Sequence, residues 1–199
     1  MLPTLYFIRH GETDWNVEGR LQGQTDIPLN AKGIGQATDA GKTLGKLLVG
    51  KPLHGMSEIP FLCSPMLRTR TTMELVRSAL GLDPTHFAED DRLKELSFGT
   101  WEGKLWSDVL AIDADRARLR EQDKWHYVPP EGESYAMLER RVMPVLHALE
   151  GPAVIVSHGG VARCLMHAIC GVDCLVAPKN DIHQGKVLLF ESGRYRWIG

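Results

Sequence analysis

Twice in this sequence a short apolar run stops abruptly at a histidine that is followed by a glycine. The first run, residues 5–8, leads into Arg9 and His10, and the second, residues 153–156, leads through a serine into His158. Apolar runs of this length, bounded by glycine and polar residues, are typical of buried strands in a parallel sheet. Ligands bind outside the carboxyl ends of such strands, so the two histidines are predicted to meet at one site.

Segments with helical periodicity separate these two predicted strands. Asn30 is a favourable N-cap for a helix expected over 31–50, in which apolar residues recur every three or four positions. A second apolar strand is expected over 59–63. Ser64 and Pro65 then suit the N-cap and the first position of a helix that runs to about residue 80.

The alternation of strands and helices continues to the end of the sequence. Helices are expected over 133–150, where Pro144 would favour a kink, and over 161–169, and a closing hairpin is expected over 187–190 and 195–198. The whole pattern predicts an α/β fold, a three-layer αβα sandwich around a mostly parallel central sheet.

One stretch interrupts this pattern. Segment 104–130 is rich in arginine, aspartate and glutamate and ends in two prolines. We expect it to form a small helical insertion, or cap, over the active site, within a single domain that spans residues 1–199. Its aromatic residues Trp106, Trp125 and Tyr127 are expected either to line a substrate cavity or to pack the insertion onto the core.

Composition and charge exclude several classes of protein. With 43% hydrophobic and 24% charged residues the chain is typical of globular proteins, and its net charge of -2 provides no general field for binding nucleic acid or an acidic membrane. No signal-peptide pattern and no apolar segment of ~20 residues is present, so a cytoplasmic protein is expected. The four cysteines form no C-x-x-C pair, so a zinc site is not expected.

The residues around the two histidines suit a phosphate group. Arg9 adjoins His10, Arg68 falls in the first turn of a predicted helix, and the helix after His158 would direct backbone N–H groups at the same site. Guanidinium groups match phosphate oxygens, and a neutral imidazole is a competent nucleophile toward phosphorus. We expect one histidine to attack while the other, protonated, stabilises the transferring group. A carboxyl group must protonate the leaving oxygen, and spacing alone leaves Glu12, Glu102 and Glu133 as candidates equal to Glu95.

Five motifs occur in order along nearly the whole chain. They are Arg9-His10-Gly11-Glu12-Thr13 with Trp15-Asn16, Ser64-Pro65-Met66-Leu67-Arg68, Leu93-Lys94-Glu95 through Phe98-Gly99 to Trp101-Glu102-Gly103, Gly132-Glu133-Ser134, and Ser157-His158-Gly159. Together these motifs resemble the histidine phosphatase superfamily, on its phosphoglycerate-mutase-like branch. The resemblance implies transfer of a phosphoryl group through a phosphohistidine intermediate.

The resemblance also implies roles for individual residues. His10 becomes the phosphorylated nucleophile and Glu95 the proton donor. The phosphate would be bound by Arg9, Arg68, His158 and Asn16, and the positions that line the pocket for the rest of the substrate are Gln22, Gly23 and Gly159. Segment 180–185 departs from the Asn-Ala-Ser pattern that many relatives have there, so the far wall of the site is left open.

Three functions are compatible with these residues. The first expectation is a phosphatase for small phosphomonoesters, because segment 98–103 resembles the phosphatase-like members of the family. The alternatives are a cofactor-dependent phosphoglycerate mutase, which would need a bisphosphoglycerate primer, and a non-catalytic binding protein on the same fold. Apart from that primer no cofactor or metal is expected, the expected partner is a small phosphorylated metabolite, and a homodimer is the base-rate expectation for the oligomeric state.

Overall fold

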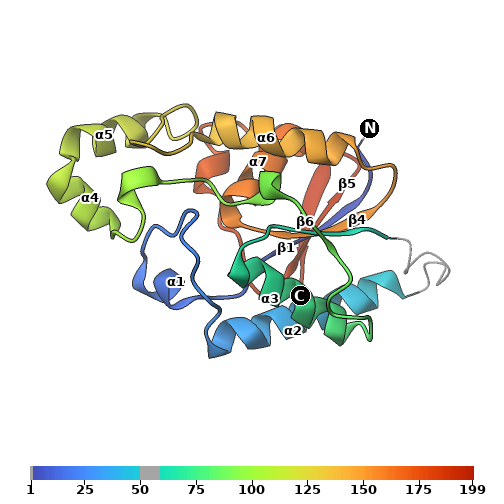
Figure 1. Cartoon of the computed structure of the whole chain (residues 1–199). Helices are drawn as coiled ribbons and strands as arrows, with labels where there is room; N and C mark the ends of the chain where they lie inside the picture. The colour runs from blue at the N-terminus through green and yellow to red at the C-terminus, as the bar shows by residue number, and fades with distance from the viewer. Residues whose placement is uncertain (1, 50–58) are drawn as a thin grey trace.

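The computed structural model describes residues 2–49 and 59–199, and Figure 1 shows a sheet with helices on both faces. The sheet has six strands in the order β3-β2-β4-β1-β5-β6. The first four of the chain run parallel to one another, and they are β1 (Leu5–Arg9), β2 (Phe61–Cys63), β3 (Ala88–Glu89) and β4 (Ala153–Ser157). The closing hairpin, β5 (Val187–Glu191) and β6 (Arg194–Ile198), is antiparallel. The predicted αβα sandwich with a mostly parallel sheet is confirmed.

The two central strands, β1 and β4, end level with each other. They pair in register as far as Arg9 and Ser157, and the backbone N–H of His10 donates to the carbonyl oxygen of Ser157 at 3.0 Å. This register places His10 and His158 side by side where the strands end, as the sequence predicted.

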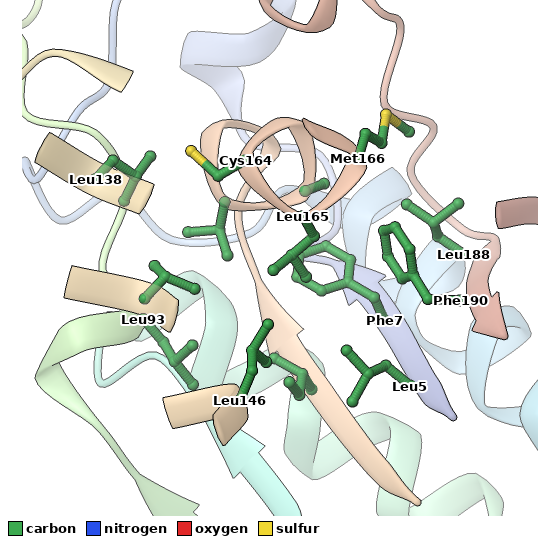
Figure 2. Packing of buried hydrophobic residues seen from close by; sticks show 14 of the residues in the cluster. Leu5, Phe7, Leu93, Leu138, Leu146, Cys164, Leu165, Met166, Leu188 and Phe190 are labelled. Carbon is green, nitrogen blue, oxygen red and sulfur yellow. The ribbon is translucent and has the colours of Figure 1, made fainter. Parts of the chain in front are cut away.

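Side chains of β1 alternate between two hydrophobic cores. Leu5 and Phe7 pack against α6 (Tyr135–His147) and α7 (Gly159–Cys170), as Figure 2 shows. The intervening side chains of β1 belong to the opposite core, which is built with α2 (Ala31–Leu48) and α3 (Leu67–Ala79). Both faces of the strand are therefore buried, which explains why the strand is a continuous apolar run.

All four predicted helices are present, but only α2 starts where predicted, and the other starts and ends within the described residues differ from the prediction by up to three residues. The side chain of Asn30 accepts from Gly33 N and caps α2, which ends at Leu48, whereas the expected end near Gly50 lies outside the described residues. Helix α6 follows its Ser134 cap and contains Pro144, and α7 begins two residues earlier than expected. In the hairpin turn Ser192 and Gly193 have φ of 51° and 72°, the left-handed values that a tight two-residue turn requires.

The predicted start of α3 was wrong by two residues. The helix begins at Leu67, after Met66, which makes no side-chain cap. The Ser64 hydroxyl lies 2.8 Å from His158 Nε2, and the Ser64 carbonyl oxygen accepts from the Thr69 hydroxyl. Ser64 does not cap the helix because its hydroxyl is engaged with the buried histidine.

The insertion consists of two helices, α4 (Trp106–Ile112) and α5 (Ala114–Gln122), which lie beyond the end of the sheet on the side of α1 (Asp14–Glu18) in Figure 1. Two of its aromatic residues, Trp106 and Tyr127, pack on Trp101 in a small hydrophobic cluster separate from the two main cores. The ring of Tyr127 stacks on Trp101, and Trp106 meets Trp101 edge-on. Among the described residues, the short elements that were not predicted are α1, β3 and the 3₁₀ turns Asp91–Leu93, Gly99–Trp101 and Ala177–Lys179.

Candidate active site

A cavity of about 240 Å³ opens at the carboxyl ends of the central strands. Eight of the nine residues predicted for the site line it, namely Arg9, His10, Asn16, Gln22, Gly23, Arg68, Glu95 and Gly159. The ninth, His158, is fully buried next to the cavity, with its ring centroid 5.2 Å from that of His10. The structure therefore brings all nine together from five separate stretches of sequence.

The imidazole of His10 is held in one tautomer. Its Nδ1 lies 2.8 Å from the carbonyl oxygen of Gly11, which only accepts, so Nδ1 carries the proton. Burial, followed by the charges of Arg68 and Arg9, lowers the pKa of His10 well below its ordinary value. The ring is therefore neutral at physiological pH, and the lone pair of its Nε2 is available for nucleophilic attack.

Two guanidinium groups flank His10, of which that of Arg68 is fully buried and that of Arg9 is partly buried. Arg9 Nη1 donates to the carbonyl oxygen of Ile182 at 2.8 Å, and Arg68 donates to the carbonyl oxygens of Gly23 and Thr25 at 2.7 and 2.9 Å. Burial and the neighbouring charge of another arginine lower the pKa of Arg9 to about 10, so it remains a cation at neutral pH. Among the described residues, Nε of each guanidinium is buried without a partner, which leaves a donor for an anionic ligand.

The second histidine is not the cation that the sequence suggested. Burial, with the charges of Arg68 and His10 next in size, lowers the pKa of His158 well below its ordinary value. Its Nε2 is bonded to the Ser64 hydroxyl, whereas its Nδ1 is buried and has no partner in the described part of the chain. If the hydroxyl donates to Nε2, neutral His158 presents an Nδ1–H donor, so it can bind a phosphate oxygen without being protonated.

Glu95 lies against the start of α7. Its carboxylate accepts from Gly160 N at 3.0 and 3.2 Å and from Leu96 N at 2.9 Å. A Cβ added at Gly160 would lie 2.3 Å from Glu95 Oε1, so only glycine permits this close approach. Of the N–H groups that the start of this helix was expected to direct at a phosphate, that of Gly160 binds the carboxylate of Glu95, while Gly159 lines the cavity.

The structure distinguishes Glu95 from the other acidic residues that were candidates for the proton donor. Glu12 is paired with Lys32 at 2.8 Å, and Glu133 is paired with Arg141 at 2.9 Å. Glu102 accepts from the backbone N–H groups of Gln24 and Phe98 and from side-chain hydroxyls. Within the described part of the chain, Glu95 is the carboxylate that lines the cavity.

Several residues of the site were missed. The unpredicted lining residues are Arg20, Leu21, Leu96, Phe98, Tyr135, Gly160 and Arg163. Arg163 had a signal that was available in the sequence, because it lies four residues after Gly159 on the same face of a predicted helix. Its Nε donates to the carbonyl oxygen of Asn180 at 3.0 Å, which ties α7 to the segment whose place the sequence left open.

Residues 2–49 and 59–199 contain no group of three or more histidine, cysteine, aspartate or glutamate side chains that could hold a metal ion. Over the same residues, no helix is both long enough and apolar enough to span a membrane.

Known proteins similar to this chain carry names of two related activities. The probable phosphoglycerate mutase GpmB of Salmonella arizonae is 35% identical over 199 residues, which cover 98% of this chain and 87% of the relative. A putative alpha-ribazole-5'-P phosphatase from Escherichia coli has a similar structure, with a TM-score of 0.78, 27% identity, and coverage of 99% of this chain and 95% of that one. A mycobacterial glucosyl-3-phosphoglycerate phosphatase, solved with VO3, has a TM-score of 0.79, 29% identity, and coverage of 98% and 96%. Fold, site and relatives together define an enzyme of the phosphatase or phosphomutase type.

The model of one family, the histidine phosphatase superfamily (branch 1), matches residues 5–198. The chain belongs to this superfamily. The match includes the insertion between the third and fourth parallel strands as well as the closing hairpin.

Proposed function

We propose that the chain is a phosphatase that hydrolyses small phosphomonoesters through a phosphohistidine on His10. The observation that carries the proposal is the neutral His10 ring at a cavity that is also lined by the flanking guanidinium groups of Arg9 and Arg68 and by the carboxylate of Glu95. This arrangement supplies a nucleophile, an anion-binding pocket and a proton donor within one small volume.

The first step of the proposed reaction transfers the phosphoryl group to the enzyme. Nε2 of His10 attacks phosphorus, and the bond from phosphorus to the ester oxygen breaks as Glu95 donates its proton to that oxygen. Arg9 and Arg68 bind the non-bridging oxygens, whose charge they stabilise through the transition state. The alcohol then leaves the cavity.

The second step restores the enzyme. Glu95, now ionised, removes a proton from a water molecule that attacks the phosphohistidine, and the bond from phosphorus to nitrogen breaks. The products are inorganic phosphate, a neutral His10 and a protonated Glu95. The first step leaves His10 phosphorylated and Glu95 ionised, as the second step requires. The second step leaves His10 neutral and Glu95 protonated, as the first step requires.

A phosphoglycerate mutase is the second candidate, and the name of the curated relative favours it. In a mutase an alcohol, rather than water, accepts the phosphoryl group from His10. The phosphatase names of similar structures favour hydrolysis. The presence of His10, Arg68 and Glu95 at one cavity, with His158 buried beside it, speaks against a non-catalytic binding protein.

We further propose that the reaction needs no metal ion and no organic cofactor. The positive charges of Arg9 and Arg68 beside His10 raise the electrostatic cost of placing a divalent cation there. EDTA is therefore expected to leave the rate of hydrolysis unchanged. A loss of activity that a divalent metal restores would overturn this part of the proposal. The substrate is proposed to be a small phosphorylated metabolite, whereas the expected homodimer and cytoplasmic location stay predictions.

The experiment that separates the two activities measures release of inorganic phosphate from a panel of small phosphomonoesters that includes 3-phosphoglycerate. Each substrate is tested with and without bisphosphoglycerate. The proposal predicts release without this primer. Primer-dependent interconversion of phosphoglycerates with little phosphate release would make the enzyme a mutase. No activity in either assay would support the alternative of a non-catalytic binding protein.

A further inference from the structure

Gln184 lies behind the cavity and contacts two residues of the site. Its Nε2 donates to the carbonyl oxygen of His10 at 3.2 Å and to Oδ1 of Asn16 at 3.0 Å. The next residue, Gly185, has φ of 75°, a left-handed value that glycine adopts without strain and that turns the chain at this point. Gln184 is not among the residues that line the cavity. It therefore acts on a ligand only through its neighbours.

The orientation of the Gln184 amide follows from its first partner. A backbone carbonyl oxygen only accepts hydrogen bonds, so the atom of Gln184 that faces His10 must be the amide nitrogen. The same nitrogen faces Asn16, which must then present an oxygen rather than its own amide nitrogen. The backbone carbonyl of His10 thus determines the orientation of both amides in turn.

Thr13 strengthens the same orientation of Asn16. The Thr13 backbone N–H donates to Asn16 Oδ1 at 3.1 Å, so two N–H donors now converge on this oxygen. A flipped Asn16 would place its own N–H donors against both of them. In the observed orientation, Nδ2 of Asn16 has no partner in the described part of the chain, and Asn16 lines the cavity.

The difference between the two orientations matters for an anion. The oxygens of a phosphate dianion only accept hydrogen bonds, so Asn16 can bind them only through Nδ2. With the amide flipped, its carbonyl oxygen would face the phosphate and repel it.

We propose that Gln184 is a positioning residue, which holds the Asn16 amide with its nitrogen toward the cavity and thereby raises the affinity of the site for a phosphate group. The inference rests on the proposed function, since it requires a phosphate to bind beside Asn16. It gives a role to a residue of segment 180–185, which departs from the expected Asn-Ala-Ser pattern.

Calorimetric titration with inorganic phosphate tests this inference without any need for turnover. Gln184→Met keeps the length of the side chain and removes its donor, and it is expected to weaken phosphate binding about 3- to 10-fold, the effect of one hydrogen bond. Asn16→Ala should weaken binding at least as much. The double variant should bind no more weakly than Asn16→Ala alone, because Gln184 has no effect once its target is removed.

The neighbouring His183→Ala is the matched control, because its exposed ring packs against Trp197, with centroids 4.8 Å apart, and away from the cavity. Its phosphate affinity should equal that of the wild type, and thermal unfolding should show that each variant is folded. If Gln184→Met does not fold, Gln184→Leu replaces it, since it also removes the donor and adds no charge near the phosphate.

Three results would overturn the inference, namely wild-type affinity in the Gln184 variant, additive losses in the double variant, or an equal loss in His183→Ala. A purely structural role for Gln184 would produce the additive result. If the wild type binds no phosphate, the proposed function fails and the inference fails with it. If the wild type binds phosphate but hydrolyses no ester, the proposed function fails alone, and the titrations still decide the role of Gln184.

Discussion

At the scale of single residues, the site depends on which groups are neutral and which are paired. His10 and His158 are both buried beside Arg68, and the pKa of each is lowered, so both rings are neutral near pH 7. Glu95 is bonded to backbone N–H groups, whereas Glu12 and Glu133 are paired with cationic side chains. Glu102 also accepts from backbone N–H groups, so the position of Glu95 at the cavity is what distinguishes it from the other candidate acids.

Glu95→Gln tests the role of proton donor. The variant keeps the shape of the side chain but cannot supply a proton, so transfer from an alkyl phosphate should slow by about 10²- to 10⁴-fold. A 4-nitrophenyl ester has a leaving group that needs no proton, so the first step with this substrate should be nearly unaffected. Single-turnover kinetics with both esters measure this difference.

Glu12→Gln serves as the control, because its carboxylate is paired with Lys32 and does not line the cavity. Its single-turnover rates should match those of the wild type with both esters. Equal losses for the alkyl and nitrophenyl esters in Glu95→Gln would assign Glu95 a role other than proton donation.

At the scale of elements, the loop after β1 is held by the first turn of α2. A Cβ added at Gly33 would lie 2.1 Å from the carbonyl oxygen of Glu12, and one added at Gly11 would lie 2.2 Å from that of Gly33. Two glycines thus allow the helix to approach the backbone that carries His10. Gly35, in the same helix, has nothing within 4 Å of an added Cβ.

Substitution of Gly33 and of Gly35 in α2 by alanine is expected to change the free energy of unfolding in opposite directions. Gly35→Ala should raise the free energy of unfolding by about 0.5–1 kcal/mol, because alanine loses less conformational freedom in a helix. Gly33→Ala should lower it by about 1–3 kcal/mol, the range typical of an overpacked site. Urea unfolding measures both values. Stabilisation by both variants would show that α2 does not contact the loop closely.

The elements were predictable where their signals were local. Strand ends at Arg9 and Ser157 and the cap at Asn30 follow from apolar runs and from a side chain that suits an N-cap. The start of α3 was not predictable, because the Ser64 hydroxyl is bound to His158 from a distant part of the sequence. Gln184 was missed for the same reason, since its partners lie more than 160 residues away.

At the scale of the whole molecule, stability and the neutral histidines are linked. In the unfolded chain a histidine titrates near pH 6.5, whereas the folded site holds His10 and His158 neutral to a much lower pH. Below pH 6.5 the unfolded state therefore binds more protons than the folded state. The stability present above pH 6.5 is lost as the pH falls toward the lowered values of the folded state.

Below pH 6.5, the free energy of unfolding is expected to fall by up to about 1.4 kcal/mol for each pH unit of acidification and for each of the two histidines. Urea unfolding at pH 7.5, 6.5 and 5.5 measures it, in a buffer without phosphate. His158→Gln should show a shallower dependence on pH over this range, because one of the two contributing groups is absent. An unchanged slope in this variant would mean that His158 is not held neutral by the fold.

Much of the molecule was readable from its sequence because the layers of the sandwich follow the apolar pattern. The paired registers of β1 and β4 then bring Arg9, His10 and His158 together without further information. Protonation states were harder to predict. The sequence suggested that His158 is protonated, whereas burial and the nearby arginines lower its pKa. Burial of this kind depends on residues from several elements, so no local pattern reports it.

The central claim is that the phosphoryl group is carried by His10, and rapid quenching during turnover tests it most directly. The reaction is stopped in base, in which phosphohistidine survives, and the modified peptide is located by mass spectrometry. The account predicts phosphorylation of His10 in the wild type and in the control His126→Ala, which changes an exposed histidine of the insertion. It predicts neither phosphoenzyme nor turnover in His10→Ala. Turnover by His10→Ala, or a phosphoryl group on another residue of the wild type, would contradict it.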